Sequence, residues 1–146
     1  MTTFPIDEFK NIETPFYYYD MELLRLTLDE VKKQAGGSKV HYAVKANANP
    51  RILAAVREAL PSARIRVDAN GGWRLSEAVD ALRELAPFGL EYAEQPCATV
   101  EELAALRARG LGVPIAADES IRKASDPLRV ARLGAADLVV VNTCGF

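Results

Sequence analysis

The stretch RIRVDANGGW occupies residues 64–73 and passes from an apolar, strand-like run into a turn rich in asparagine and glycine. Four other apolar runs lie on either side of it, and their last residues are spaced 23 to 26 positions apart: HYAVK (41–45), LEYAE (90–94), PIAAD (114–118) and LVVVN (138–142). A helix-like stretch separates each run from the next. Because consecutive parallel strands need a crossover connection, usually a helix, this alternation predicts repeated βα units.

Each run ends in a polar residue, and the five are Lys45, Asp68, Glu94, Asp118 and Asn142. In parallel α/β folds the carboxyl ends of the strands form the edge of the sheet where chemistry takes place. The spacing therefore predicts one lysine, three carboxylates and one asparagine along a single edge.

The full pattern predicts six strands and five helices in one α/β domain over residues 1–146. The expected strands are 16–20 (FYYYD), 40–45, 64–68, 90–94, 113–118 and 137–142, and the expected helices are about 20–36, 50–60, 76–85, 99–110 and 126–133. Asp20 and Thr99 are expected to cap helices at their amino ends, and Pro50 suits a first helical position.

Two architectures fit this element order. A closed βα barrel needs eight strands and typically about 250 residues, so this chain would form only part of one. An open, doubly wound sheet of five or six strands also suits the length. We favour a partial barrel derived from the TIM fold, whose bare strand edges would be covered by another chain, as in a homo-oligomer.

Composition narrows the partners and the compartment. The net charge is −2 and the isoelectric point is near 5.5, without a basic patch, so we expect no nucleic-acid partner. No apolar run approaches the ~20 residues of a membrane span, and the first residues lack a signal-peptide pattern, so a cytoplasmic location is expected. Cys97 and Cys144 are expected to be idle thiols, and His41, the only histidine, a strand residue.

Asp68, Glu94 and Asp118 are candidate ligands of a divalent cation. Neighbouring strands are ~4.8 Å apart, so carboxylates on successive strand ends can reach one ion, and an all-oxygen set suits Mg²⁺. Such an ion stabilises an enolate, and Lys45 on the preceding strand is the candidate catalytic residue for moving the proton. The alternative is that these acids only cap helices and form turns. Without an ion the three carboxylates should repel, and one should titrate at a high pH.

RIRVDANGGW, LEYAEQP and PIAADES resemble the third, fourth and fifth barrel strands of the enolase superfamily. EYAEQPCATVEELAALR and DPLRVARLGAAD are most similar to the o-succinylbenzoate synthases, Mg²⁺-dependent dehydratases, over about residues 54–138. The resemblance implies that Asp68, Glu94 and Asp118 are the Mg²⁺ ligands, with Asn70 a neighbouring polar residue. The family's Lys-x-Lys pair is incomplete because Ala43 stands in its first position, and Asn142 replaces a later lysine.

The amino-terminal segment, about residues 4–59, resembles diaminopimelate decarboxylases through ETPFYYYDMELLRLTLDEVKK and HYAVKANANPRIL. That resemblance implies that Lys45 forms a Schiff base with pyridoxal phosphate (PLP), although the family's glycine-rich phosphate loop is missing. ADLVVVNTCGF (136–146) resembles part of the radical-SAM methylthiotransferases, whose cysteine binds an iron–sulfur cluster. Cys144 has no partner cysteines at useful spacing, so we expect no cluster here.

Three parentages in one chain favour a chimera that was engineered, recombined or generated, decarboxylase-like over 1–59 and enolase-like over 60–146. Our first interpretation is therefore an α/β scaffold without efficient catalysis that keeps a weak Mg²⁺ site. One alternative is a residual Mg²⁺-dependent lyase with Lys45 as the base. A second is a PLP-binding decarboxylase-like fragment that uses Lys45.

Overall fold

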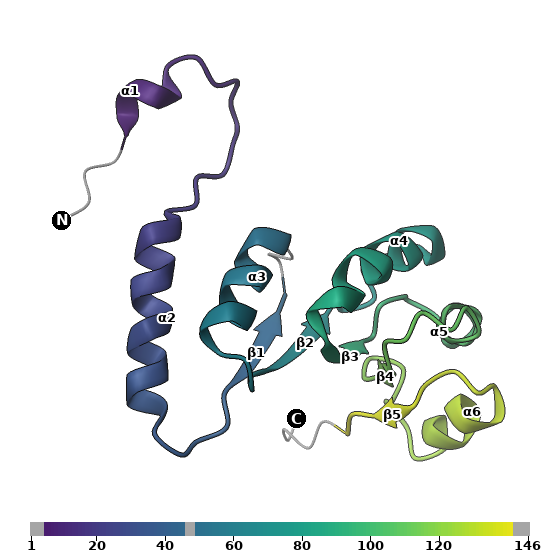
Figure 1. Cartoon of the computed structure of the whole chain (residues 1–146). Coiled ribbons are helices and arrows are strands. Elements are labelled where there is room, and N and C mark those ends of the chain that lie inside the picture. The colour runs from purple at the N-terminus through teal and green to yellow at the C-terminus, as the bar shows by residue number, and fades with distance from the viewer. Residues whose placement is uncertain (1–4, 46–48, 142–146) are drawn as a thin grey trace.

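The computed structural model describes residues 5–45 and 49–141 (Figure 1). Its helices are α1 (Ile6–Phe9), α2 (Met21–Ala35), α3 (Pro50–Ala59), α4 (Leu75–Leu85), α5 (Val100–Arg107) and α6 (Asp126–Arg132), with a 3₁₀ turn η1 (Ala86–Phe88). Its strands are β1 (His41–Val44), β2 (Arg64–Asp68), β3 (Leu90–Glu94), β4 (Ile115–Ala117) and β5 (Leu138–Val139).

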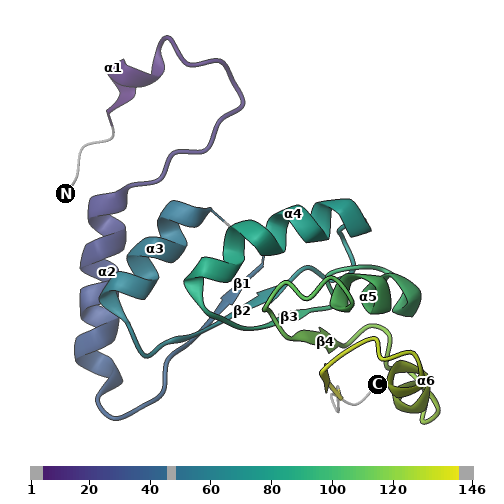
Figure 2. The same cartoon turned by 45° about the vertical axis from the view of Figure 1, so that its right-hand side comes forward.

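The five strands form one parallel sheet in the order β1-β2-β3-β4-β5. Each strand thus pairs with its successor in the chain, and α3 and α4 lie over the same face of the sheet in both views (Figures 1 and 2). A doubly wound sheet reverses its strand order at a switch point, and the described strands show no such reversal. The predicted partial barrel is therefore the observed architecture, and the doubly wound alternative does not fit.

The core lies between the sheet and its helices. In β2 the alternation of a strand buries Ile65 and Val67 and leaves Arg64 and Arg66 toward the other face. Helices α3, α4 and α5 supply most of the apolar side chains packed against it. Among these, Leu53, Val56, Leu82, Leu103 and Leu106 are fully buried, and strands β2 and β4 add Ile65 and Ile115.

The predicted helix starts are confirmed by their caps. The side chain of Asp20 accepts a hydrogen bond from the backbone N–H of Leu23 at 2.9 Å and so begins α2. Pro50 occupies the first turn of α3. Thr99 and Glu102 form a reciprocal capping box at α5.

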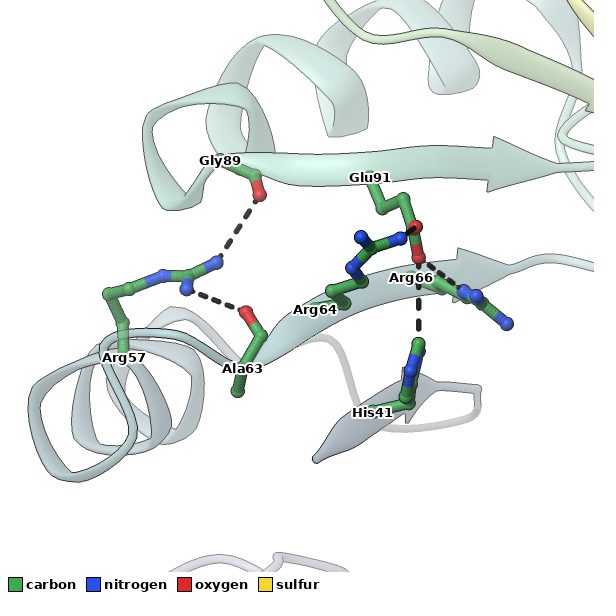
Figure 3. Close-up of polar contacts among 7 residues, drawn as sticks. All are labelled: His41, Arg57, Ala63, Arg64, Arg66, Gly89 and Glu91. Atoms are coloured by element: carbon green, nitrogen blue, oxygen red, sulfur yellow. Dashed lines mark hydrogen bonds and ion pairs between the residues drawn. The ribbon is translucent and has the colours of Figure 1, made fainter. Parts of the chain in front are cut away.

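Arg57, near the end of α3, fastens the amino ends of two strands (Figure 3). Its guanidinium donates to the carbonyls of Ala63 at 2.7 Å, Phe88 at 2.8 Å and Gly89 at 3.2 Å, and also to that of Pro61. These carbonyls precede β2 and β3. One side chain therefore satisfies backbone acceptors that the helix ends and turns leave unpaired.

The predicted strand FYYYD is wrong. Residues 16–20 have no regular secondary structure, and Tyr17 is 88% exposed. The segment has no strand beside it to satisfy its backbone, and instead the rings of Phe16 and Tyr18 pack on Phe9 of α1, with centroids 5.3 and 5.0 Å away. The described residues thus contain five strands, with His41 at the start of β1 as expected.

Candidate functional site

Four of the five predicted polar residues lie at the carboxyl edge of the sheet. Lys45 directly follows β1, Asp68 and Glu94 are the last residues of β2 and β3, and Asp118 directly follows β4. Asp68 and Glu94 are paired residues in the ladder between their strands. The fifth, Asn142, lies outside the described residues.

Lys45 and Asp68 form an ion pair across the first two strands. The Nζ atom lies 2.5 Å from Oδ2 of Asp68, whose side chain is only 10% exposed, whereas the lysine side chain is 63% exposed. This hydrogen bond and the charge of Asp68 raise the pKa of Lys45 above its usual value, and the charges of Glu94 and Glu119 act in the same direction. The lysine is therefore held in its ammonium form in the absence of a cation.

Glu94 is the carboxylate that titrates high, as the close approach of three acids predicts. Partial burial is the main cause that raises its pKa, followed by the charges of Asp68 and Asp118 and a hydrogen bond with the Asp118 carboxyl. The charge of Lys45 opposes this shift without cancelling it. The edge thus carries more negative charge than its own lysine neutralises.

Gln95, which no sequence pattern indicates, holds the ends of β3 and β4 together. Its side chain is fully buried, and Oε1 accepts hydrogen bonds from the backbone N–H groups of Asp118 at 2.9 Å and Ser120 at 3.2 Å. Nε2 donates to Oγ of Ser120 at 2.8 Å and to the carbonyl of Cys97 at 2.9 Å. Its backbone has a positive φ of 35°. The only signal in the sequence is its place directly after Glu94, which says nothing of these contacts.

A second missed residue is Glu119, which directly follows Asp118. Its Oε1 accepts a hydrogen bond from Nδ2 of Asn70 at 2.8 Å, and the backbone N–H of Asn70 donates to Oδ1 of Asp68 at 3.1 Å. The other oxygen, Oε2, is buried and has no hydrogen-bond partner among the described residues. The acidic edge is therefore short of positive or proton-donating groups.

The donor set fits a hard divalent cation. Asp68, Glu94 and Asp118 offer only carboxylate oxygens, the ligands that Mg²⁺ accepts. Within residues 5–45 and 49–141, no group of three or more His, Cys, Asp or Glu side chains is already gathered as a metal-binding cluster. Asp68 is engaged by Lys45, and Glu94 is engaged with Asp118. The side chains must therefore rotate for all three to bind one ion.

A second set of charges lies on the same face of the sheet, toward the amino ends of the strands (Figure 3). Glu91 contacts Nη1 of Arg64 at 2.5 Å and Nε of Arg66 at 2.6 Å, and His41 Nδ1 lies 3.9 Å away. The hydrogen bond from Arg66 is the main cause that lowers the pKa of Glu91. The guanidinium of Arg66 also lies 4.9 Å from the centre of the Tyr92 ring. Two arginines face one glutamate, so this cluster keeps a net positive charge, and the charge of Glu94 at the acidic edge also raises the pKa of Arg66.

Comparison with known proteins gives a family match over most of the chain. A model of the family described as "Enolase C-terminal domain-like" matches residues 22–145. An o-succinylbenzoate synthase of Mycolicibacterium smegmatis is 67% identical over 88 residues, which are 60% of this chain and 26% of that protein. The corresponding synthase of Thermobifida fusca is 60% identical over 88 residues and 27% of its length. The chain spans about a quarter of the length of these curated relatives.

Solved structures give the same result. A mandelate racemase/muconate lactonizing family protein from Azoarcus sp. EbN1 superimposes with a TM-score of 0.67 and 27% identity, over 80% of this chain and 32% of that one. A racemase from Streptomyces coelicolor A3(2) with bound magnesium gives 0.64 and 27% identity, over 84% of this chain and 39% of that one.

These matches bear on the chimeric interpretation. One family model runs through most of the segment compared with decarboxylases and nearly all of that compared with methylthiotransferases. It supports the enolase part. It gives no support to the decarboxylase and methylthiotransferase parts, and none to an engineered origin or to a PLP site. A Schiff-base lysine also needs a lowered pKa, whereas that of Lys45 is raised.

Cys144 lies outside the described residues. No helix in the described part of the chain is long and apolar enough to cross a membrane.

Proposed function

Because the chain belongs to the enolase C-terminal domain-like family, we propose that it supplies the cation-binding part of a Mg²⁺-dependent lyase or isomerase site. The more specific proposal is a dehydration of the o-succinylbenzoate synthase type. The high identity to two such synthases over 88 residues supports it. These findings favour the lyase interpretation over that of a scaffold without catalysis.

Asp68, Glu94 and Asp118 are the proposed Mg²⁺ ligands, one from the end of each of three successive strands. A cation held there by these three carboxylates would supply electrostatic stabilisation to negative charge that develops on a substrate oxygen. The Gln95 side chain positions Asp118 by accepting a hydrogen bond from the backbone N–H of Asp118. The backbone N–H of Asn70 donates to one carboxylate oxygen of Asp68. The ligands thus come from strand ends that backbone pairing and buried hydrogen bonds already fix.

Lys45 is the proposed proton carrier. Its contact with Asp68 is the observation that carries this proposal, because it places the amine beside a ligand carboxylate. The same contact holds the amine protonated, so Lys45 becomes a base only when Asp68 turns to another positive charge. In a dehydration the neutral amine takes a proton from carbon, the C–O bond breaks, and the ammonium returns the proton to the leaving hydroxide as water.

Isothermal titration of the whole chain with MgCl₂ tests the cation site. We expect binding by the wild type and a loss of at least tenfold in affinity for Asp68→Asn, which keeps the side-chain shape but removes the charge. Glu30→Gln, a similar change in an exposed carboxylate of α2, is the control and should bind as the wild type does. Equal affinities of the wild type and Asp68→Asn would contradict the site.

The reaction needs its own test. Formation of o-succinylbenzoate, followed by mass spectrometry, should depend on Mg²⁺ and be abolished by Lys45→Met. Product formed at the same rate by Lys45→Met would remove Lys45 from the mechanism. Mg²⁺ binding without turnover would leave the cation site in place and overturn the dehydration.

A further inference from the structure

Glu119 connects two strand ends that are not neighbours in the sheet. It follows β4, whereas its hydrogen-bond partner Asn70 follows β2, and β3 lies between these strands. The contact from Nδ2 of Asn70 to Oε1 of Glu119 measures 2.8 Å and joins residues 49 positions apart. It therefore sets the distance between the loops that carry the two outer proposed ligands, Asp68 and Asp118.

Asn70 passes this constraint to Asp68. Its backbone has a positive φ of 48°, a conformation that asparagine tolerates better than most residues but that is still uncommon. In this conformation its N–H points at Oδ1 of Asp68, 3.1 Å away. The side chain of Asn70 is thus held by Glu119 while its backbone holds the ligand.

The backbone of the Glu119 loop is fixed without the Glu119 carboxylate. Gln95 accepts from the N–H groups of Asp118 and Ser120, on either side of Glu119. The carbonyl of Glu119 accepts a hydrogen bond from Nε of Arg122 at 2.9 Å. Replacement of the Glu119 side chain should therefore leave the fold in place and remove only the connection to Asn70.

We propose that Glu119 is a positioning residue of the cation site, which acts through Asn70 to orient the carboxylate of Asp68. The inference rests on the proposed function, because it takes Asp68 as a ligand. It adds a residue outside the three ligands on which cation affinity depends. Substitution of a residue that hydrogen-bonds to a metal ligand, without binding the metal itself, typically lowers metal affinity by about 10- to 100-fold.

The test compares two substitutions of the same side chain by Mg²⁺ titration and by electron paramagnetic resonance with Mn²⁺. Glu119→Ala removes the acceptor and should weaken binding about tenfold. Glu119→Gln keeps an oxygen that accepts from Nδ2 of Asn70 and should bind within about threefold of the wild type, a rescue that follows from a positioning role. Unfolding in urea without metal should be nearly the same for all three proteins, because Gln95 and Arg122 hold the backbone of this loop without the Glu119 carboxylate.

A double-mutant cycle identifies the route through Asn70. Asn70→Gly removes the amide but tolerates the positive φ, so it tests the side chain without new backbone strain. Combined with Glu119→Ala, it should weaken binding no further than the more damaging single change. Additive losses would show independent roles and overturn the inference.

The remaining outcomes separate the two proposals. Wild-type affinity in Glu119→Ala, with Asp68→Asn still impaired, overturns the positioning role and leaves the proposed function standing. A Glu119→Gln protein as weak as Glu119→Ala also overturns it, because the charge rather than the hydrogen bond would then matter. Failure of the wild type to bind Mg²⁺ overturns the proposed function, and this inference with it.

Discussion

Asp68 and Glu94 are partners at the last pair of the parallel ladder between β2 and β3, so backbone pairing itself sets two carboxylates side by side. Neighbouring strands are about 4.8 Å apart, and repulsion at that separation is costly unless a positive charge intervenes. In the structure that charge is Lys45, which contacts Asp68. The state of this edge therefore depends on what neutralises it.

Replacement of Asp68 should change the titration of Lys45. The hydrogen bond from Lys45 to Asp68 is the main cause of the raised lysine pKa, so Asp68→Asn should lower that pKa toward 10.5. Nuclear magnetic resonance of the lysine Nζ measures it directly, with Glu30→Gln on α2 as the control. An unchanged Lys45 pKa in Asp68→Asn would show that the ion pair does not form in solution. The raised pKa of Lys45 stabilises the folded protein fully at pH values below the lysine pKa of the unfolded chain. This contribution is lost as the pH rises through the lysine pKa of the folded protein.

Glu94 should make the protein less stable as pH rises above the ordinary range of a glutamate. Its pKa is raised in the folded state, so the folded protein binds more protons than the unfolded one between the two pKa values. The contribution is complete below the unfolded pKa and is lost as pH rises through the folded pKa. Urea unfolding between about pH 4 and pH 7 should show this decline in the wild type relative to Glu94→Gln.

Glu91 is the matched control for that series. Its pKa is lowered by Arg66 and Arg64, so its contribution has the opposite sign and is lost as pH falls through the folded pKa. Relative to the wild type, Glu91→Gln should therefore lose more stability at pH 7 than at pH 4. Identical pH profiles for the two variants would contradict the assignment of both shifts.

Arg57→Met should destabilise the fold by about 2 kcal/mol, because it leaves two partly buried carbonyls, those of Ala63 and Phe88, without this donor. Arg51 provides the control, since it is an exposed arginine on the same helix, and Arg51→Met should change the free energy of unfolding by less than about 0.5 kcal/mol. Chemical denaturation measures both. Equal effects would mean that the carbonyls find other donors.

Gln95→Leu should cost about 2 to 3 kcal/mol of unfolding free energy, because it buries the N–H groups of Asp118 and Ser120 without an acceptor. It should also weaken Mg²⁺ binding, since Asp118 then loses its anchor. If stability fell but affinity held, the role of Gln95 in the site would be contradicted.

The outer strands should promote self-association. Strands β1 and β5 are the edges of the sheet, and Leu138 and Val139 of β5 are 43% and 44% exposed. We expect light scattering to show a dimer that Val139→Lys dissociates. Ile6→Lys, a change at a more exposed residue (67%) on α1 away from the sheet (Figure 1), should leave the dimer intact. A monomeric wild type would contradict this prediction.

Much of the fold is predictable from the sequence because its signals are local. The bounds of β2 and β3 agree with the apolar runs residue for residue, and the capping residues Asp20 and Thr99 mark the starts of their helices. The FYYYD segment shows the limit of such signals. Its aromatic residues favour a strand by composition, but a strand needs a neighbour, and that depends on chain far from it.

The residues of the candidate site also fall into those that the sequence pattern predicts and those that only the folded structure identifies. Lys45, Asp68, Glu94 and Asp118 follow apolar runs, so periodicity finds them. Gln95 and Glu119 have no such signal, because their roles arise from contacts with residues 25 and 49 positions away. Arg57 is similar, with partner carbonyls up to 32 positions distant. Those contacts exist only once the strands are assembled.

The sequential strand order has a consequence for how such a site changes over evolution. Since each strand pairs only with the strands next to it in the chain, every βα unit is a replaceable module that contributes its own terminal side chain. Exchange of one unit would substitute one ligand or one proton carrier, and it would also remove contacts that cross between units, such as those of Gln95 and Glu119. The polar side chains along this edge therefore lie in the same order as their βα units in the chain.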